Sequence, residues 1–178
     1  VYGGQYKGTA GINTFKFLDV LTTGNYSRFV FNHFRDIVIE NPNIAIHLNT
    51  IGVDDIKGNS FENITVWHPK IGFNTGTTGT LLNTHIEGNT FVNFQLQPYE
   101  DTTHGINIDF GSNNYFSNTS LWDFAKQYRT SIPIRLGVET SHNQFWGLTG
   151  GWISDSDYDV IDLGRNNRYA SIERTKLG

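Results

Sequence analysis

Two aspartates and an arginine have the residue types and the spacing to do chemistry in this chain. They lie in three similar alternating segments that each end in glycine. Superposed with two earlier segments of the same kind, these segments form one outward row of stacked strands that holds His47, Gly72, Asp109, Arg135 and Asp162. Because stacked strands lie about 4.8 Å apart, the two aspartates would be about 10 Å apart with the arginine between them.

This arrangement predicts a candidate catalytic pair, Asp109 and Asp162, with Glu100 and Asp101 as substitutes. Two carboxylates about 6.5–9.5 Å apart suit an inverting glycosidase, because a water molecule must fit beside the sugar. Arg135 between them would keep both carboxylates ionised rather than raise the pKa of one. The alternative is a surface charge ladder that only stabilises the sheet.

Three insertions follow the first strand of successive coils and are expected to stack into a wall beside this row. They span residues 97–104, 122–131 and 151–159. Together with Arg135 they supply the candidate substrate-binding residues, which are His104, Trp122, Tyr128, Arg129, Trp152 and Tyr158. Flat apolar rings beside directed polar groups are what a sugar-binding groove needs. The alternative is that the two tryptophans pack back onto the coil.

The elements that position these residues follow from an internal repeat. An Asn-x-aromatic pattern recurs six times, at Asn32, Asn59, Asn89, Asn114, Asn143 and Asn167. The spacings are 27, 30, 25, 29 and 24 residues. A period of this size indicates a solenoid.

Alternating apolar stretches between the repeats predict strands with one buried face. We therefore expect an all-β fold, a right-handed parallel β-helix of about six coils with a period of about 27 residues, over residues 31–178. Residues 1–30 fit the repeat poorly and are expected to form a cap or an incomplete coil. Two inward rows are expected: an aromatic row of Phe34, Phe61, Phe91, Phe116, Phe145 and Tyr169, and a second row of Ile37, Ile64, Phe94, Thr119, Leu148 and Ile172.

A bend is expected between these two inward rows, four residues after the Asn of the repeat. Asp36, Asn63, Asn93 and Asn118 occupy it in successive coils. Asparagine and aspartate tolerate a left-handed backbone, and an Asn side-chain amide can bond to the next coil. The sequence thus predicts a ladder that holds the turn.

Composition excludes several classes of function. Charged residues make up only 17% of the chain, the net charge is −4 and there is no basic cluster, so nucleic acid is not an expected partner. No apolar run approaches the roughly 20 residues that span a bilayer. There is no Cys, and no metal or cofactor site is expected. The absence of Met suggests that Val1 is the edge of a longer polypeptide.

The repeat and the Asn ladder resemble those of right-handed parallel β-helix proteins of the pectin-lyase-like superfamily. That superfamily includes polysaccharide lyases and hydrolases as well as bacteriophage tailspikes, among which homotrimers are common. The resemblance implies a glycan-recognising module of a phage or viral spike, or of an extracellular polysaccharide-active protein, that acts outside cells or on a virion surface. Two alternatives stay open, a polysaccharide hydrolase and a non-catalytic structural or adhesive spike segment, because fold does not settle function.

Overall fold

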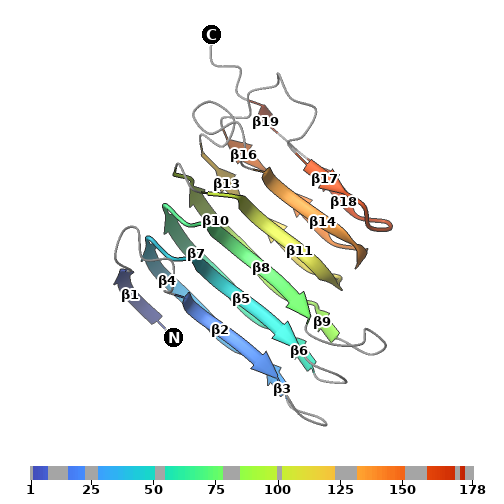
Figure 1. Cartoon of the computed structure of the whole chain (residues 1–178), viewed down its shortest axis with the longest axis horizontal. Coiled ribbons are helices and arrows are strands. Elements are labelled where there is room, and N and C mark those ends of the chain that lie inside the picture. Colours follow the sequence, from blue (N-terminus) through green and yellow to red (C-terminus); the bar gives the residue numbers. More distant parts are fainter. Residues whose placement is uncertain are drawn as a thin grey trace.

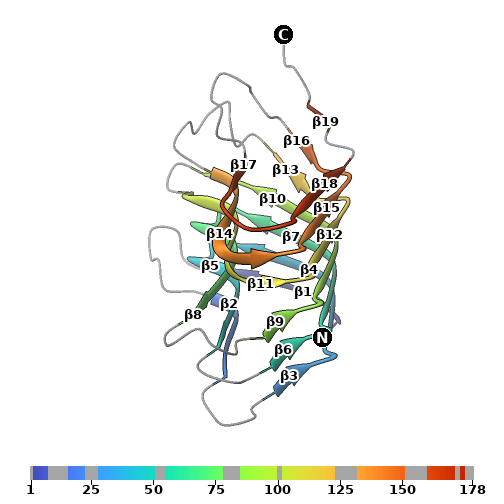
Figure 2. The same cartoon turned by 90° about the vertical axis from the view of Figure 1, so that its right-hand side faces the viewer.

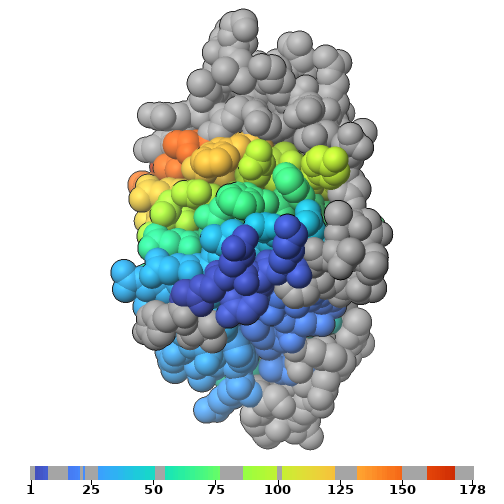
Figure 3. Space-filling model, turned by 90° about the vertical axis from the view of Figure 1, so that its left-hand side faces the viewer, coloured from blue at the N-terminus to red at the C-terminus, as the bar shows by residue number. Residues whose placement is uncertain are grey.

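The computed structural model of the chain describes residues 2–7, 16–22, 28–50, 55–77, 85–99, 102–122, 132–150, 160–170 and 173–174. All secondary structure in these residues is β-strand, and every strand pair is parallel. The chain winds into a β-solenoid whose coils stack in sequence order, as the succession of colours from blue to orange in Figure 3 shows. The predicted fold class is therefore confirmed.

The first sheet forms one side of the solenoid and contains ten strands. They are β1 (Tyr2–Lys7), β4 (His33–Glu40), β7 (Ser60–Trp67), β10 (Thr90–Gln97), β12 (Tyr115–Ser117), β13 (Ser120–Leu121), β15 (Gln144–Trp146), β16 (Thr149–Gly150), β18 (Arg168–Ala170) and β19 (Glu173–Arg174). Four successive coils, which begin with β1, β4, β7 and β10, have long strands on both sides of the solenoid. The regular stack thus makes about four turns, slightly fewer than the six coils expected, because later first-sheet strands have only two or three residues.

The second sheet faces the viewer in Figure 1 and carries the candidate functional residues. Its long strands are β2 (Lys16–Thr22), β5 (Ile44–Thr50), β8 (Ile71–Thr77), β11 (His104–Ser112) and β14 (Ile132–Ser141), followed by the short β17 (Val160–Asp162). Three further strands, β3 (Arg28–Val30), β6 (Asp55–Lys57) and β9 (His85–Glu87), stack along a third side and join this sheet through the end of β11. Figure 2 shows these three strands one above the other.

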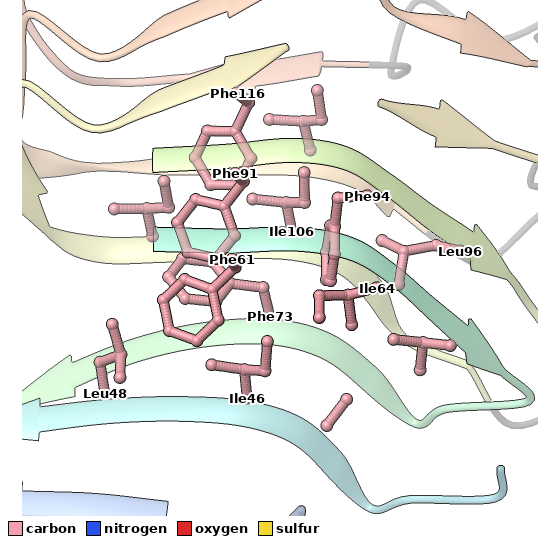
Figure 4. Close-up of a cluster of buried hydrophobic side chains, with 14 of the residues drawn as sticks. Ile46, Leu48, Phe61, Ile64, Phe73, Phe91, Phe94, Leu96, Ile106 and Phe116 are labelled. Atoms are coloured by element: carbon pink, nitrogen blue, oxygen red, sulfur yellow. The ribbon is translucent and has the colours of Figure 1, made fainter. Parts of the chain in front are cut away.

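The interior is built from rows of like side chains, as expected. Phe61, Phe91 and Phe116 stack in one row with ring centroids 4.7 and 4.4 Å apart and nearly parallel planes (Figure 4). Phe34, Phe145 and Tyr169 extend the row at its two ends. Each fully buried Phe contributes roughly 1.5–3 kcal/mol, so this row is a main source of stability. In the second row Ile37, Ile64 and Phe94 are in register and fully buried, whereas Ile172 lies outside the described residues.

Two Asn ladders hold the turns. In the buried ladder, the backbone N–H and the Nδ2 of each repeat Asn both donate to the Oδ1 of the next Asn, with distances of 2.9–3.2 Å from Asn32 to Asn167. The predicted bend ladder is confirmed, since its four residues have φ between 50° and 57°. Its Asn63 Nδ2 donates to Asp36 Oδ1 at 2.8 Å, and Asn93 Nδ2 donates to Asn63 Oδ1 at 2.9 Å.

The strands β1, β2 and β3 make up the first described coil. β1 pairs with β4, β2 with β5 and β3 with β6, in the same parallel manner as all later coils. In the described part of the chain no helix has the length and the apolar character to cross a membrane.

Candidate functional site

A continuous row of polar side chains runs across the outward face of the second sheet. Strand register aligns Asp19 with His47, His47 with Asn74, Asn74 with Asn107, and Asn107 with Arg135. We call these five residues the polar row. Each lies between two inward residues of its strand, all apolar except Thr75 beside Asn74, so strand alternation alone directs it outward.

At one end of the polar row an aspartate, a histidine and a lysine form a compact group. Asp19 Oδ1 lies 2.8 Å from His47 Nδ1, and Asp19 Oδ2 accepts from Lys16 Nζ at 2.9 Å. Burial is the largest influence on the Asp19 carboxyl and raises its pKa, but the bonds from Lys16 and His47 together outweigh it and hold the pKa below its usual range. This carboxylate therefore loses its contribution to stability only in acid, as pH falls through that lowered pKa.

At the other end, an amide chain leads to an ion pair. Asn107 Nδ2 donates to Asn74 Oδ1 at 2.7 Å, and Arg135 Nη1 donates to Asn107 Oδ1 at 2.8 Å. The same Arg135 nitrogen forms a salt bridge with Asp109 Oδ1, while Asp109 Oδ2 accepts from Asn107 Nδ2 at 3.3 Å. Both oxygens of Asp109 thus have a protein partner.

His104 lies beside this group, in register with Ile71 and Ile132. Burial lowers the pKa of its imidazole, the positive charge of Arg135 lowers it further, and Asp109 opposes both effects in part. His104 is therefore neutral near pH 7 and offers one donor and one acceptor nitrogen. Because its folded pKa lies below the unfolded value, its contribution to stability falls as pH drops below about 6.5.

The expected outward row was wrong in register at three of its five positions. Asn74, not Gly72, lies beside His47, and Asn107, not Asp109, lies beside Arg135. At Asp109 the shift is of two residues, which leaves the side chain on the same face, so the alternating pattern cannot reveal it. Gly72 is instead turned inward, since a Cβ built on it would lie 2.5 Å from the buried Leu96. Asp109 still forms an ion pair with Arg135, at the point where the register of β11 and β14 shifts between Ile108 and Phe110.

Asp162 does not belong to this face at all. It pairs with the buried Leu136, one residue away from the expected position, and a one-residue shift reverses the direction of the side chain. Its carboxylate accepts from Gly164 N, Asn167 Nδ2 and Tyr169 Oη, each at 2.9 Å. Burial and this bond to Asp162 raise the pKa of Tyr169 well above its usual range, so its hydroxyl stays protonated. Asp162 therefore ends the aromatic row, and it does not form a pair with Asp109.

Exposed aromatic side chains gather where the first sheet ends. Trp67 pairs with Gln97, and the N–H of Trp122 donates to the carbonyl of Leu96 at 2.9 Å, which places Trp122 beside Gln97 on the next coil. Trp67 and Trp122 thus share an outward row two coil steps apart, about 10 Å. The exposed fractions of Trp67, Tyr99 and Trp122 are 38%, 47% and 44%. We call these three residues the aromatic corner.

Tyr99 is held in place by the coil below it. Its ring lies 4.9 Å from the ring of His68, and its backbone N–H donates to Thr102 Oγ1 at 2.8 Å. Thr102 in turn bonds to the carbonyl of Pro69, and the N–H of Thr103 donates to the carbonyl of Lys70 at 2.8 Å. The segment that begins at Tyr99 therefore leads directly into His104 on the second sheet.

The remaining predicted site residues lie outside the described residues. They are Glu100, Asp101, Tyr128, Arg129, Trp152 and Tyr158, together with most of the expected wall of insertions. Trp122 is 44% exposed, so the coil covers part of its surface and solvent reaches the rest. Among the described residues, no group of three or more His, Asp or Glu is arranged to hold a metal ion.

Sequence reasoning missed Asn74 and Asn107 as the partners of Arg135, missed Asp19 as the partner of His47, and missed Trp67. Trp67 could have been found, because it follows the repeat aromatic by six residues, as Gln97 and Trp122 do in the next two coils. No comparable signal exists for the second sheet, where the connections before each strand differ in length.

These observations define the protein as a parallel β-solenoid with a polar face on one sheet and an aromatic corner beside it. The chain matches no protein-family model, no curated protein and no solved structure.

Proposed function

We propose that this chain is a glycan-binding module of a β-solenoid protein, and that it binds its glycan without cleaving it. The observation that carries the proposal is the aromatic corner, in which three exposed rings from three successive coils line one edge of the stack. Trp67 and Trp122 lie two coil steps apart, about 10 Å, which is comparable with the length of a disaccharide. Large exposed aromatic groups in one place mark binding surfaces in soluble proteins.

The polar row supports the same proposal. It presents amide, imidazole, guanidinium and carboxylate groups in fixed orientations, since each is bonded to at least one neighbour in the row. Such rigid, directed donors and acceptors provide the specificity of ligand sites. His104 and the Tyr99 segment connect this face to the aromatic corner.

Hydrolysis is the less favoured alternative. An inverting pair needs two carboxylates that flank one sugar with room for water. Asp109 is engaged by Arg135 and Asn107, whereas Asp162 is engaged by Tyr169 and Asn167 on a different row. Neither residue has the free carboxyl group that the mechanism requires.

The wider setting belongs to the same proposal. The parallel coils and the buried Asn ladder support membership of the pectin-lyase-like superfamily, and within it a phage or viral spike or an extracellular polysaccharide-binding protein. A virion-surface or extracellular location and a homotrimer follow from that resemblance. A purely structural spike segment is the second candidate, favoured by the way the polar row is satisfied internally.

A glycan-array screen of the native chain tests the proposal, with Trp67→Ala and Trp122→Ala as variants. Loss of an aromatic anchor costs about 2 kcal/mol, so each variant is expected to bind about 30-fold more weakly. Trp146→Ala is the matched control, because Trp146 is also 42% exposed on the first sheet but lies away from the corner. It should bind as the native chain does.

A reducing-end assay on every array hit completes the test, with Asp109→Asn and Asp162→Asn run beside the native chain. We expect binding without release of reducing ends. If the native chain releases reducing ends and either variant does not, the protein is a hydrolase instead. If the chain binds no glycan, the purely structural spike segment is the alternative that remains.

A further inference from the structure

Gly76 leaves a gap in the outward face of the second sheet, one residue before the end of β8. Its neighbour on β5 is Asn49. A Cβ built on Gly76 would lie 3.6 Å from His47 Nε2, 3.7 Å from Asn74 Nδ2 and 4.0 Å from Asn49 Oδ1. Three polar atoms from two strands therefore converge on one empty position, which we call the Gly76 notch.

Neither backbone conformation nor packing requires a glycine here. Gly76 does not have the positive φ that marks Gly58 and Gly88. Its imagined Cβ meets only ordinary van der Waals contacts, whereas a Cβ on Gly72 would come within 2.5 Å of Leu96. Besides bulges and tight bends, a glycine inside a strand is typical of places where a ligand or another backbone approaches closely.

The hydrogen-bonding character of two atoms in the notch is set by their neighbours. Asn74 Oδ1 accepts from Asn107, so the amide nitrogen of Asn74 faces the notch as a donor. His47 Nδ1 lies 2.8 Å from an Asp19 oxygen, which only accepts, so Nδ1 is the donor in this contact, and in the neutral ring Nε2 then presents its lone pair to the notch. The contact of Lys16 with the same nitrogen is longer, at 3.4 Å, and Lys16 has its own partner in Asp19.

Asn49 provides a second observation that points to a ligand and does not depend on the glycine at position 76. This residue is only 9% exposed, and its Oδ1 is buried without any hydrogen-bond partner. A buried acceptor that lacks a donor is rare and costly. Because Oδ1 has no bond to break and the terminal torsion of Asn is soft, the amide can turn toward a donor that enters the notch.

We propose that the Gly76 notch receives a hydroxyl-bearing carbon of a glycan. The hydroxyl accepts from Asn74 Nδ2 and donates to His47 Nε2 or Asn49 Oδ1, and the missing Cβ leaves room for the carbon that carries it. This proposal rests on the proposed glycan-binding function and adds to it the substrate feature that is recognised. A single ordered water would satisfy the same atoms, so the test must separate the two.

The test uses NMR of the full chain with methyl glucoside, methyl galactoside and methyl mannoside as probes, followed by binding to the array glycans. The side-chain amide signal of Asn74 and the ring nitrogens of His47 report directly on the notch. We expect at least one probe to shift both. In Gly76→Ala, which fills the notch, the shifts should vanish and array affinity should fall at least tenfold at an unchanged melting temperature.

Two further variants keep the test decisive. Asn49→Ala removes the orphaned acceptor and is expected to weaken binding in the same way, whether or not Gly76→Ala folds. Ser117→Thr is the matched control, since it adds one methyl group to an outward position of the first sheet and should change nothing.

The outcomes separate the notch from the proposed function. Equal array binding by native chain, Gly76→Ala and Asn49→Ala would overturn the notch and leave the glycan-binding function standing. A probe shift that Gly76→Ala abolishes, without any array binding, would support the notch as a hydroxyl site and overturn the function. If no probe shifts the signals of Asn74 and His47, the notch holds an ordered water only, and the proposal of a hydroxyl site is overturned.

Discussion

At the scale of single residues, the chemistry-bearing side chains of this protein are partners of one another before they are partners of a ligand. Asp109 bonds to Arg135 and Asn107, and Asp19 bonds to Lys16 and His47. Such pairing fixes geometry and leaves few groups free. The exposed indole rings of Trp67 and Trp122 in the aromatic corner point to binding rather than to proton transfer.

Phe31 is the residue whose backbone is least suited to its type. Its φ is 58° and its side chain is 78% exposed, whereas other coils place Gly58, Gly88, Asn113, His142 and Asn166 at this turn. A left-handed backbone costs an ordinary residue about 1–2 kcal/mol, and Asn tolerates it better. Phe31→Asn is therefore expected to raise the free energy of unfolding by roughly 0.5–1 kcal/mol in a urea titration.

His142→Asn is the matched control for this change. It replaces a residue with φ 56° at the same turn of another coil, where histidine is already tolerated, and should shift the unfolding free energy by less than about 0.5 kcal/mol. A loss of stability in Phe31→Asn would mean that the contact of the ring with Gly58 outweighs the backbone strain.

At the scale of elements, the buried Asn ladder links each coil to the next. Asn89 Oδ1 accepts two bonds from Asn59, and Asn89 Nδ2 donates to Asn114 Oδ1 and to the carbonyl of Ile56. These groups lie beyond the reach of solvent, since Asn59, Asn89 and Asn114 are at most 1% exposed. The ladder therefore holds the turns of adjacent coils in one register.

Asn89→Ala should be strongly destabilising, because it removes the acceptor of the Asn59 backbone N–H and of one side-chain N–H of Asn59, whose other side-chain N–H still donates to the carbonyl of Phe29. Each buried unsatisfied group costs about 1–3 kcal/mol, so we expect a loss of at least about 2–4 kcal/mol in unfolding free energy. Asn93→Gly, in the bend ladder near solvent, is the comparison, and water should limit its cost to about 1 kcal/mol. Equal costs for the two variants would contradict this role of the buried ladder.

Sequence reasoning predicted the first sheet better than the second. The repeat aromatic and the residues after it stay in phase, so Phe61, Phe91 and Phe116 stack as expected. Four residues after the repeat Asn, the left-handed bend also appears where it was predicted. The connections before the strands of the second sheet vary in length. The strand register therefore differs from the expected alignment at Asp109 and at Asp162.

At the scale of the whole molecule, the solenoid is a one-dimensional stack in which each coil pairs only with its neighbours. β7 has partners on both sides, β4 and β10, whereas β1 pairs only with β4 and β18 only with β15 among the described strands. In such a stack stability is the sum of coil and interface terms, and the ends open first. The central coils are thus the rigid support for both the aromatic corner and the polar row.

Hydrogen exchange should show this gradient. Amides of β7, β8 and β10 are expected to exchange by global unfolding and to be the slowest, whereas amides of β1 and β18 exchange through local opening at the ends. Native-state exchange followed by NMR or mass spectrometry measures both sets in one experiment. Uniform protection along the stack would contradict independent opening of the ends.

The sequence by itself determined the repeat, the parallel stacking, the inward rows and the left-handed bends, because each depends on residue type and short-range periodicity within one coil. Only the tertiary structure decided which outward residues meet. A two-residue shift between strands keeps every side chain on its face and leaves the pattern of the sequence unchanged. The network of Asn74, Asn107 and Arg135 and the gap at Gly76 depend on that register, since their atoms come from different coils.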